Sequence, residues 1–217
     1  MKRKQPNKYQ TDHFARKAKK EHFPARSVYK LQEIQEKFHV MKKGDRVLDI
    51  GCAPGSWVKY AARVVGDKGR VVGIDLKEVS EPFPAHVRVM TGDVIALSES
   101  DAVKTAEILG TGYHAVLSDM APSTTGHRDV DAARSYYLCR AALEIARKHL
   151  VPGGCFVCKI FQGGDFEAFI EAVRNGFERH KIFKPQSCRK ESKEIYIIGL
   201  GKKQEDEECR DIASGQI

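Results

Sequence analysis

The alternation of short apolar segments with amphipathic segments constrains the fold of this chain more than any other feature. Segments typical of buried strands are RVLDIG, RVVGIDL, YHAVLSDM, CFVCKIF and EIYIIGL, and HVRVMTGD reads as a shorter strand. Strands that alternate with helices predict a mainly parallel sheet covered on both faces. The last two strand-like segments, HKIFK and EIYIIGL, have no helix between them, which predicts that the final strand is antiparallel. The expected fold class is therefore α/β.

Helical spacing of apolar residues marks the segments between the strands. In RSVYKLQEIQEKF the repeat is formed by Val28, Leu31, Ile34 and Phe38, and Pro24 precedes it as a start signal. The segments SWVKYAARVV, VDAARSYYLCRAALEIARKHL and FEAFIEAVRNGF read as further helices, and LSESDAVKTAEILG reads as one continuous helix.

Length and composition fit one globular domain. The chain has 217 residues, of which 41% are hydrophobic and 30% charged, enough for one core and short for two domains. We expect a basic arm over 1–20, a folded domain over 21–200, and a polar tail over 201–217 that is disordered. No apolar run approaches the roughly 18 residues that span a bilayer, and the start MKRKQPNKYQ lacks the apolar segment of a secretory signal. We therefore expect a cytoplasmic protein without membrane contact.

The positive charge is concentrated at the N-terminus. The formal net charge is +8, and residues 1–20 hold eight Lys and Arg side chains against the single acid Asp12. Such an arm is typical of proteins that neutralise phosphates, which indicates an RNA partner. The alternative is a solvated basic tail without a partner.

The six cysteines do not form a metal site in this interpretation. Cys155 and Cys158 make a C-x-x-C motif, but CFVCKIF reads as a buried strand. Residues three apart on a strand point to opposite faces, so these thiols are poorly placed to share a metal ion. The eight histidines lack metal-ligand spacing. We expect reduced, mostly buried cysteines and no bound metal.

A nucleoside pocket is predicted where the first strands end, because ligands of open α/β sheets bind beyond the carboxyl ends of the strands. In VLDIGCAPGSW, Gly51 and Gly55 allow a tight turn, and Pro54 stiffens a loop that departs from the dinucleotide pattern G-x-G-x-x-G. Asp75, at the end of the second strand, is placed to accept hydrogen bonds from ribose hydroxyls. Asp93, at the end of the third strand, is placed to accept from an exocyclic amine. S-adenosylmethionine fits this set better than a dinucleotide. The alternative is a plain structural turn with helix-capping acids.

Charged residues converge on the same edge of the sheet from distant segments. Asp119 follows the fourth strand, Lys159 stands near the end of the fifth, and Glu194 begins the antiparallel last strand. A lysine in an apolar strand is costly to bury unless it is paired or used. Structural ion pairs are the alternative for each residue taken alone.

Over residues 10–200 the chain resembles the FtsJ/RrmJ family of S-adenosylmethionine-dependent ribose 2′-O-methyltransferases. The motifs that carry the resemblance are ARSVYKLQEI, VLDIGCAPGSW, GIDL, GD, SDMAP, CKIFQGGD and SKEIYIIG. The resemblance implies a seven-stranded Rossmann-like methyltransferase fold and a catalytic tetrad at Lys30, Asp119, Lys159 and Glu194. It implies cofactor-binding positions at Gly55, Trp57, Asp75, Asp93 and Asp119, to which the turn adds Gly51 and Pro54.

Two departures from the family pattern are visible. Gly55-Ser56 replaces the Gly-Gly that often precedes the tryptophan, a small change that should leave the pocket open. KKEHFPARS replaces a Gly-Tyr-Arg-Ser-like sequence, which bears on RNA contact rather than on chemistry.

The implied reaction is an in-line attack of a ribose 2′-oxygen on the sulfonium methyl group, and Lys159 is the candidate for handling the hydroxyl proton. Burial and Lys30 favour a neutral lysine, whereas Asp119 and Glu194 favour the ammonium. In the second case Lys159 would orient the oxygen and stabilise its developing charge. Asp119 would hold Lys159, and Glu194 and Lys30 would position the ribose.

The resemblance implies a ribosomal RNA or ribosomal particle as partner, most specifically a uridine of the large-subunit (23S) RNA, and we expect a monomer. Tyr29 or Phe23 would stack on an RNA base or pack the first helix onto the sheet. Three other functions stay open: methylation of a transfer RNA anticodon loop, RNA binding without catalysis, and a nicotinamide-dependent reductase. The intact tetrad disfavours the second, and the missing G-x-G-x-x-G disfavours the third.

Overall fold

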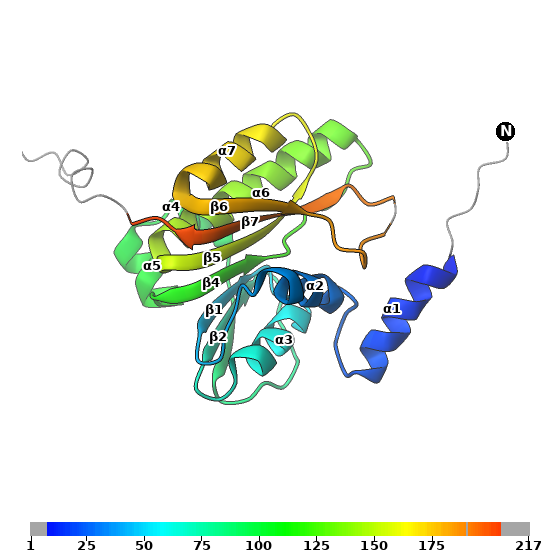
Figure 1. Cartoon of the computed structure of the whole chain (residues 1–217), viewed down its shortest axis with the longest axis horizontal. Coiled ribbons are helices and arrows are strands. Elements are labelled where there is room, and N and C mark those ends of the chain that lie inside the picture. The colour runs from blue at the N-terminus through cyan, green and yellow to red at the C-terminus, as the bar shows by residue number, and fades with distance from the viewer. Residues whose placement is uncertain (1–7, 190, 205–217) are drawn as a thin grey trace, which may run out of the picture.

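The computed structural model describes residues 8–189 and 191–204 and contains one seven-stranded sheet (Figure 1). The strand order is β3-β2-β1-β4-β5-β7-β6. The strands are β1 (Arg46–Ile50), β2 (Arg70–Asp75), β3 (Val87–Thr91), β4 (Tyr113–Ser118), β5 (Leu150–Phe161), β6 (Phe177–Phe183) and β7 (Glu194–Lys202). β7 lies between β5 and β6 and is antiparallel to both, whereas the pairs from β3 to β5 are parallel. The α/β class and the antiparallel last strand are thus confirmed.

The helices cover both faces of the sheet, as the alternating pattern predicts. In chain order they are α1 (Lys8–Lys20), α2 (Val28–Phe38), α3 (Ser56–Val65), α4 (Val94–Glu99), α5 (Ala102–Leu109), α6 (Arg128–His149) and α7 (Phe166–Gly176). Apolar residues of α2 and α3 form a core on one face, and α4, α6 and α7 form the larger core on the other. Figure 1 shows α2 and α3 against β1 and β2, with α6 and α7 on the opposite side.

The alternation of side chains along β5 divides the two cores. Val157 belongs to the core under α2 and α3, and Phe156 and Cys158 belong to the other core. Cys155 packs against the first core, so Cys155 and Cys158 face opposite sides of the sheet, as predicted. Cys209 lies outside the described residues.

Two helical predictions differ from the structure. LSESDAVKTAEILG forms two helices rather than one, because Asp101 accepts hydrogen bonds from the Val103 and Lys104 N–H groups and starts α5 afresh. Residues 8–20 of the expected basic arm form α1, which the apolar spacing did not predict. The predicted disordered tail begins too early, because β7 continues to Lys202. The part of the tail beyond residue 204 lies outside the described residues.

A small third core attaches the first helix to the rest of the domain. Ala18, Phe23, Val28 and Tyr29 are buried in it, and Phe14 packs against them. The hydroxyl of Tyr29 donates to Glu21 at 3.0 Å. Tyr29 and Phe23 are 3% and 5% exposed, so they pack the first helices together, and the stacking alternative is wrong for these two side chains.

Candidate active site

The strand order reverses between β1 and β4, which is where open α/β sheets bind their ligands. α3 follows β1 onto one face of the sheet, and α6 follows β4 onto the other. The connections after β1 and β4 therefore leave the same edge of the sheet toward opposite faces, and β7 begins at this edge because Glu194 pairs with Phe161 at the end of β5. We call this edge the rim. Figure 1 shows α1 and α2 on the side where β7 begins.

Lys159 and Asp119 meet at the rim. The ammonium nitrogen Nζ of Lys159 lies 2.9 Å from Oδ1 of Asp119 and donates to the Asp119 carbonyl oxygen at 2.5 Å. The Tyr196 hydroxyl donates to the same Oδ1 at 2.6 Å. Tyr196 is opposite Lys159 in the β5–β7 register, so the sheet itself fixes this triad.

A second ion pair lies beside the first. Nζ of Lys30, from α2, is 2.8 Å from Oε2 of Glu194, and both side chains are largely buried, at 13% and 11% exposure. The four predicted catalytic residues thus come together from α2, the end of β4, β5 and the start of β7. Two positive and two negative charges balance, which allows their burial.

The charges of the cluster hold its carboxylates ionised. Burial would raise the pKa of the Asp119 carboxyl, but Lys159, Lys30 and the Tyr196 hydroxyl together bring that pKa below its ordinary value. Burial would also raise the pKa of the Glu194 carboxyl, but the charge and hydrogen bond of Lys30 bring that pKa below its ordinary value. For Lys30, burial lowers the pKa, and the charges of Asp119 and Glu194 outweigh it and raise the pKa. The two carboxylates, Asp119 and Glu194, and the Lys30 ammonium are therefore charged at neutral pH.

The turn after β1 is shaped by two glycines in left-handed conformations. Gly51 has φ +76°, and a Cβ atom there would lie 2.3 Å from the Met120 side chain, just beyond Asp119. Gly55 has φ +102°, and a Cβ there would lie 3.0 Å from Phe83 in the loop after β2. Pro54 lies between them, after a cis peptide bond. The turn can approach its neighbours closely only because both positions lack a side chain.

The two predicted nucleoside-binding acids lie at the rim, and both also serve the backbone. Asp75 accepts from the Ala53 N–H of the glycine turn at 2.9 Å and from the Lys77 N–H at 2.8 Å. Asp93 is exposed, and its Oδ1 caps α4 by accepting from Ile95 N–H at 2.8 Å. The capping interpretation therefore holds for Asp93, while its second oxygen makes no bond within the described residues.

Trp57 is placed differently from the other predicted cofactor positions. Its indole N–H donates to the Ser27 carbonyl at 2.8 Å, and its ring lies 6.0 Å from that of Tyr196, between ring centroids. The side chain is 3% exposed and belongs to the core under α2 and α3. Only the backbone of Trp57, in the first turn of α3, can face a ligand. Ser56 is directed toward α2, since its hydroxyl accepts from the Ala25 N–H at 2.7 Å.

Asp49 is a buried acid close to Asp119 and Asp75 that the motifs did not single out. It lies in β1 and is 1% exposed, and neither carboxyl oxygen has a hydrogen-bond partner among the described residues. Burial raises the pKa of this carboxyl well above its usual value, and the charges of Asp119 and Asp75 add to the effect. The signal was present in VLDIG, where an acid interrupts an apolar strand.

Replacing Asp49 by Asn should remove a pH-dependent loss of stability. A carboxyl whose pKa is raised by folding binds its proton more tightly in the native state, so stability falls as pH rises above the unfolded value of about 3.9, by roughly 1.4 kcal/mol per pH unit, until the raised pKa is passed. We expect the thermal midpoint of the parent chain to fall relative to that of Asp49→Asn between pH 5 and pH 8. Parallel curves for the two proteins would refute this account of Asp49.

The residues at the rim fit S-adenosylmethionine. Within residues 8–189 and 191–204 no group of three or more His, Cys, Asp or Glu side chains could hold a metal. The rim combines a glycine turn with acids at Asp75 and Asp93 that are placed for a nucleoside. Carboxylates around such a turn suit a ligand with ribose hydroxyls and cationic groups.

Sequence comparison also indicates a methyltransferase, over most of the chain. The FtsJ-like methyltransferase family model matches residues 23–202. A protein of Desulforapulum autotrophicum named ribosomal RNA large subunit methyltransferase E is 56% identical over 202 residues, which cover 93% of this chain and 98% of the relative. The protein of the same name from Oleidesulfovibrio alaskensis is 50% identical, and the match covers 88% of this chain and 91% of the relative.

Solved structures agree in fold. A Plasmodium falciparum protein assigned as a ribosomal RNA methyltransferase superposes with a TM-score of 0.73 at 26% identity, over 84% of this chain and 100% of the other. Aeropyrum pernix fibrillarin, crystallised with bound S-adenosyl-L-methionine, superposes with a TM-score of 0.55 at 17% identity, over 80% and 76% of the two chains. The second likeness concerns the fold alone.

Proposed function

The chain belongs to the FtsJ-like methyltransferase family, and we propose that it transfers a methyl group from S-adenosylmethionine to a ribose 2′-hydroxyl of large-subunit ribosomal RNA, most specifically of a uridine. The observation that carries this proposal is the Lys159–Asp119 pair at the rim, next to the glycine turn. The names of the closely similar relatives support the RNA substrate. A cytoplasmic location and action as a monomer complete the proposal.

Lys159 is the proposed catalytic residue. An ammonium has three N–H donors, and two of those on Lys159 point at the carboxylate and the carbonyl of Asp119. The third is left to hold the ribose 2′-oxygen. It orients a lone pair of that oxygen and stabilises the negative charge that develops on it. Because Asp119 stays ionised, it favours the ammonium form of Lys159. The hydroxyl proton becomes strongly acidic as the oxygen–carbon bond forms, and it passes to water at the rim.

The other residues of the cluster position the reacting groups. S-adenosylmethionine, when bound, supplies a methyl group that its sulfonium already activates, so alignment is the main task of the protein. Asp119 holds Lys159 and is itself held by Tyr196, while the Lys30–Glu194 pair borders the place of the ribose. Tyr196 is an addition to the predicted tetrad.

The glycine turn and the acids around it form the proposed cofactor site. Asp75 would bind the ribose hydroxyls, and the free oxygen of Asp93 would accept from the adenine amine. Gly51, Pro54, Gly55 and the backbone of Trp57 would line the site.

The assay of the proposed function uses the complete chain, tritiated S-adenosylmethionine and two substrates, large ribosomal subunits and their purified RNA. We expect methyl incorporation into the large-subunit RNA and an alkali-resistant dinucleotide at the modified position, because a 2′-O-methyl group blocks hydrolysis of the adjacent phosphodiester. Transfer RNA offered in the same assay should stay unlabelled. Label on a base rather than a ribose, or on transfer RNA alone, would contradict the proposal.

The basic surface of α1 should bind the RNA backbone. Lys19 and Lys20 are exposed at the end of α1, whereas Phe14 and Ala18 anchor this helix to the domain. The double variant Lys19→Gln/Lys20→Gln should lower RNA affinity and reduce the slope of log affinity against log salt by about 1.5, since each phosphate contact contributes roughly 0.7 to 0.9. S-adenosylmethionine affinity, measured by calorimetry, should be unchanged. An unaltered salt slope would remove α1 from the RNA-binding surface.

A further inference from the structure

Three arginines gather at the amino ends of the strands, at the end of the sheet opposite the rim. Arg46 begins β1, Arg70 begins β2, and Arg88 is the second residue of β3. In the parallel register Arg46 pairs with Arg70, and Arg88 pairs with Val72, two residues farther along β2. Because side chains alternate along a strand, positions 46, 70, 72 and 88 all face the same side of the sheet. This is the face that α4, α5 and α6 cover farther along.

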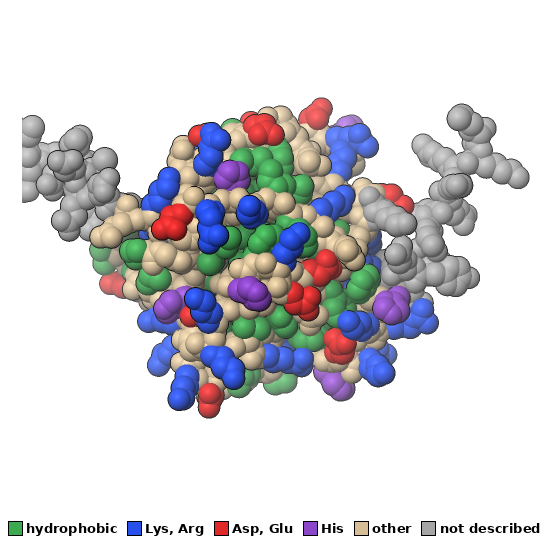
Figure 2. Space-filling view, viewed as in Figure 1, with side chains coloured by type: hydrophobic (Ala, Val, Ile, Leu, Met, Phe, Trp, Pro, Cys, Tyr) green, Lys and Arg blue, Asp and Glu red, His purple; other side chains and the backbone are tan. Residues whose placement is uncertain are grey.

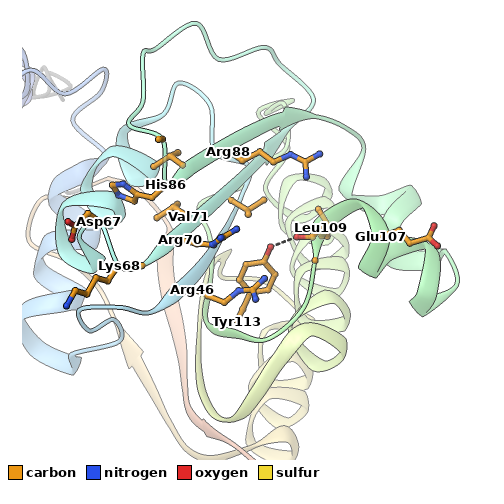
Figure 3. A pocket seen from close by; sticks show the side chains of 15 residues that line it. Arg46, Asp67, Lys68, Arg70, Val71, His86, Arg88, Glu107, Leu109 and Tyr113 are labelled. Carbon is orange, nitrogen blue, oxygen red and sulfur yellow. Dashed lines mark hydrogen bonds between the residues drawn. The ribbon is translucent and has the colours of Figure 1, made fainter.

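The arginines line a hollow of about 640 Å³. Its walls come from the start of β1, the turn before β2, the loop before β3 and the end of α5. Figure 3 shows the side chains of Arg46 and Arg70 beside Tyr113, with Arg88 above them in the view. All three arginines are exposed, so the hollow opens to solvent.

The positive charges of the group are not neutralised within the described chain. No ion pair joins Arg46, Arg70 or Arg88 to a carboxylate of residues 8–189 or 191–204. The Arg46 guanidinium lies 5.7 Å from the Tyr113 ring centroid, and the charges of Arg46 and Arg88 both lower the pKa of the Tyr113 hydroxyl against the larger effect of burial. The guanidinium groups of Arg46 and Arg88 therefore both lie close enough to the Tyr113 hydroxyl to influence it electrostatically. Like charges so placed repel one another, and a bound anion would relieve the repulsion.

The remaining charged residues of the hollow leave a positive excess. Lys68 adds a fourth cation, against the two acids Asp67 and Glu107. In Figure 3 these acids lie toward opposite sides of the view, Asp67 beside Lys68 and Glu107 on α5, with the arginines between them. None of the large hydrophobic side chains that are exposed among the described residues, such as Leu76 and Val103, lines the hollow. An acidic or phosphate-bearing partner fits such a surface, and an apolar protein interface does not.

We propose that this group of Arg46, Arg70 and Arg88, here called the arginine hollow, binds backbone phosphates of the RNA substrate at a distance from the methylated nucleotide. The proposal rests on the proposed function, which supplies a large folded RNA. Arginine suits the role because its planar guanidinium donates two parallel hydrogen bonds to a phosphate. The hollow is open and its three arginine side chains are exposed, as contact with a continuous strand requires.

The position of the arginine hollow predicts which RNA can use it. β1 has five residues, and a strand of that length spans roughly 17 Å, so the hollow and the rim cannot hold the same nucleotide. A short oligonucleotide around the target ribose would reach the rim alone. A large folded RNA can present a second segment to the hollow. We therefore expect the arginine hollow to matter for large substrates and not for short ones.

The test compares the triple variant Arg46→Gln/Arg70→Gln/Arg88→Gln with the parent chain on two RNAs. One is the large-subunit RNA in its natural assembly, and the other is a short hairpin that carries the target nucleotide. We expect KM for the large substrate to rise roughly tenfold at physiological salt, and the slope of log KM against log salt to fall by about 2. The KM values for the hairpin and for S-adenosylmethionine, and kcat on both RNAs, should be unchanged.

A matched control removes three positive charges elsewhere. Lys104 on α5, Lys181 on β6 and Lys203 after β7 are exposed and do not line the hollow. Lys104→Gln/Lys181→Gln/Lys203→Gln should leave KM for both RNAs unchanged. An equal loss in the control, an equal loss on the hairpin, or no loss in the arginine variant would overturn the proposal. Failure of the parent chain to methylate RNA would instead refute the proposed function.

Discussion

Lys159→Ala should lower the rate of methyl transfer to RNA by roughly 10²–10³-fold or more, the loss that follows removal of a donor to a developing oxyanion. The side chain holds the ribose oxygen in the proposed mechanism, and no neighbouring group can replace it, because Lys30 is committed to Glu194 at 2.8 Å. Lys159→Arg should be nearly as inactive, since the planar guanidinium does not fit the position of a compact ammonium that shares the Asp119 carboxylate oxygen with the Tyr196 hydroxyl.

The measurement is transfer of tritiated methyl to RNA, with calorimetric binding of S-adenosylmethionine in parallel. The affinity for S-adenosylmethionine should stay within about twofold of the parent value, because Lys159 contacts the ribose of the RNA and not the cofactor. A tenfold loss, equivalent to about 1.4 kcal/mol, would contradict this placement. Lys181→Ala, an exposed lysine on β6, is the control and should keep full activity. Substantial turnover by Lys159→Ala would exclude this residue from the chemistry.

Asp119→Ala should be the most destabilising single change in the site. It leaves the Lys159 ammonium buried at 7% exposure with only a carbonyl partner, and it strips the Tyr196 hydroxyl of its acceptor. Removing one partner of a buried ion pair costs roughly 3–5 kcal/mol. Methyl transfer should be lost as well, because nothing then fixes Lys159.

A double variant separates these two effects. Asp119→Ala/Lys159→Met removes both charges and should recover much of the stability lost in Asp119→Ala, while it remains inactive. Urea denaturation of the parent chain, both single variants and the double variant gives the coupling between the two residues. Additive losses would show that the pair is not a unit. In the parent chain the lowered pKa of Asp119 implies a stability contribution that is complete above about pH 4 and disappears as pH falls through the lowered value.

The α/β class and the order of most strands and helices could be predicted from the sequence, because the period of side-chain burial differs between strands and helices. The strand pattern placed Lys159, Asp119 and Glu194 at one edge without coordinates, since parallel strands share their carboxyl ends and the last strand is reversed. The structure brings Lys30 to the same cluster through α2, a contact that depends on how this helix packs and that only the family resemblance indicated.

Features that depend on a side chain competing for backbone hydrogen bonds, or on packing between distant elements, could not be predicted from the sequence. The break between α4 and α5 arises because the Asp101 side chain captures two backbone N–H groups, which helical periodicity does not register. The burial of Trp57 depends on the Ser27 carbonyl and the Tyr196 ring, which come from two distant elements. α1 is held by the small core around Phe14 and Ala18 rather than by a long apolar face.

The place of β7 has a consequence for how the protein is made. β6 is synthesised before β7 but joins the sheet only through it, and Glu194 and Tyr196 enter the rim with the same strand. A nascent chain that has not yet emerged past residue 202 therefore has a detached edge strand and a rim without two of its side chains. The charged cluster is therefore completed only when β7 has joined the sheet, and a chain that ends before this strand should lack both the pairing of β6 and the Glu194 and Tyr196 contacts.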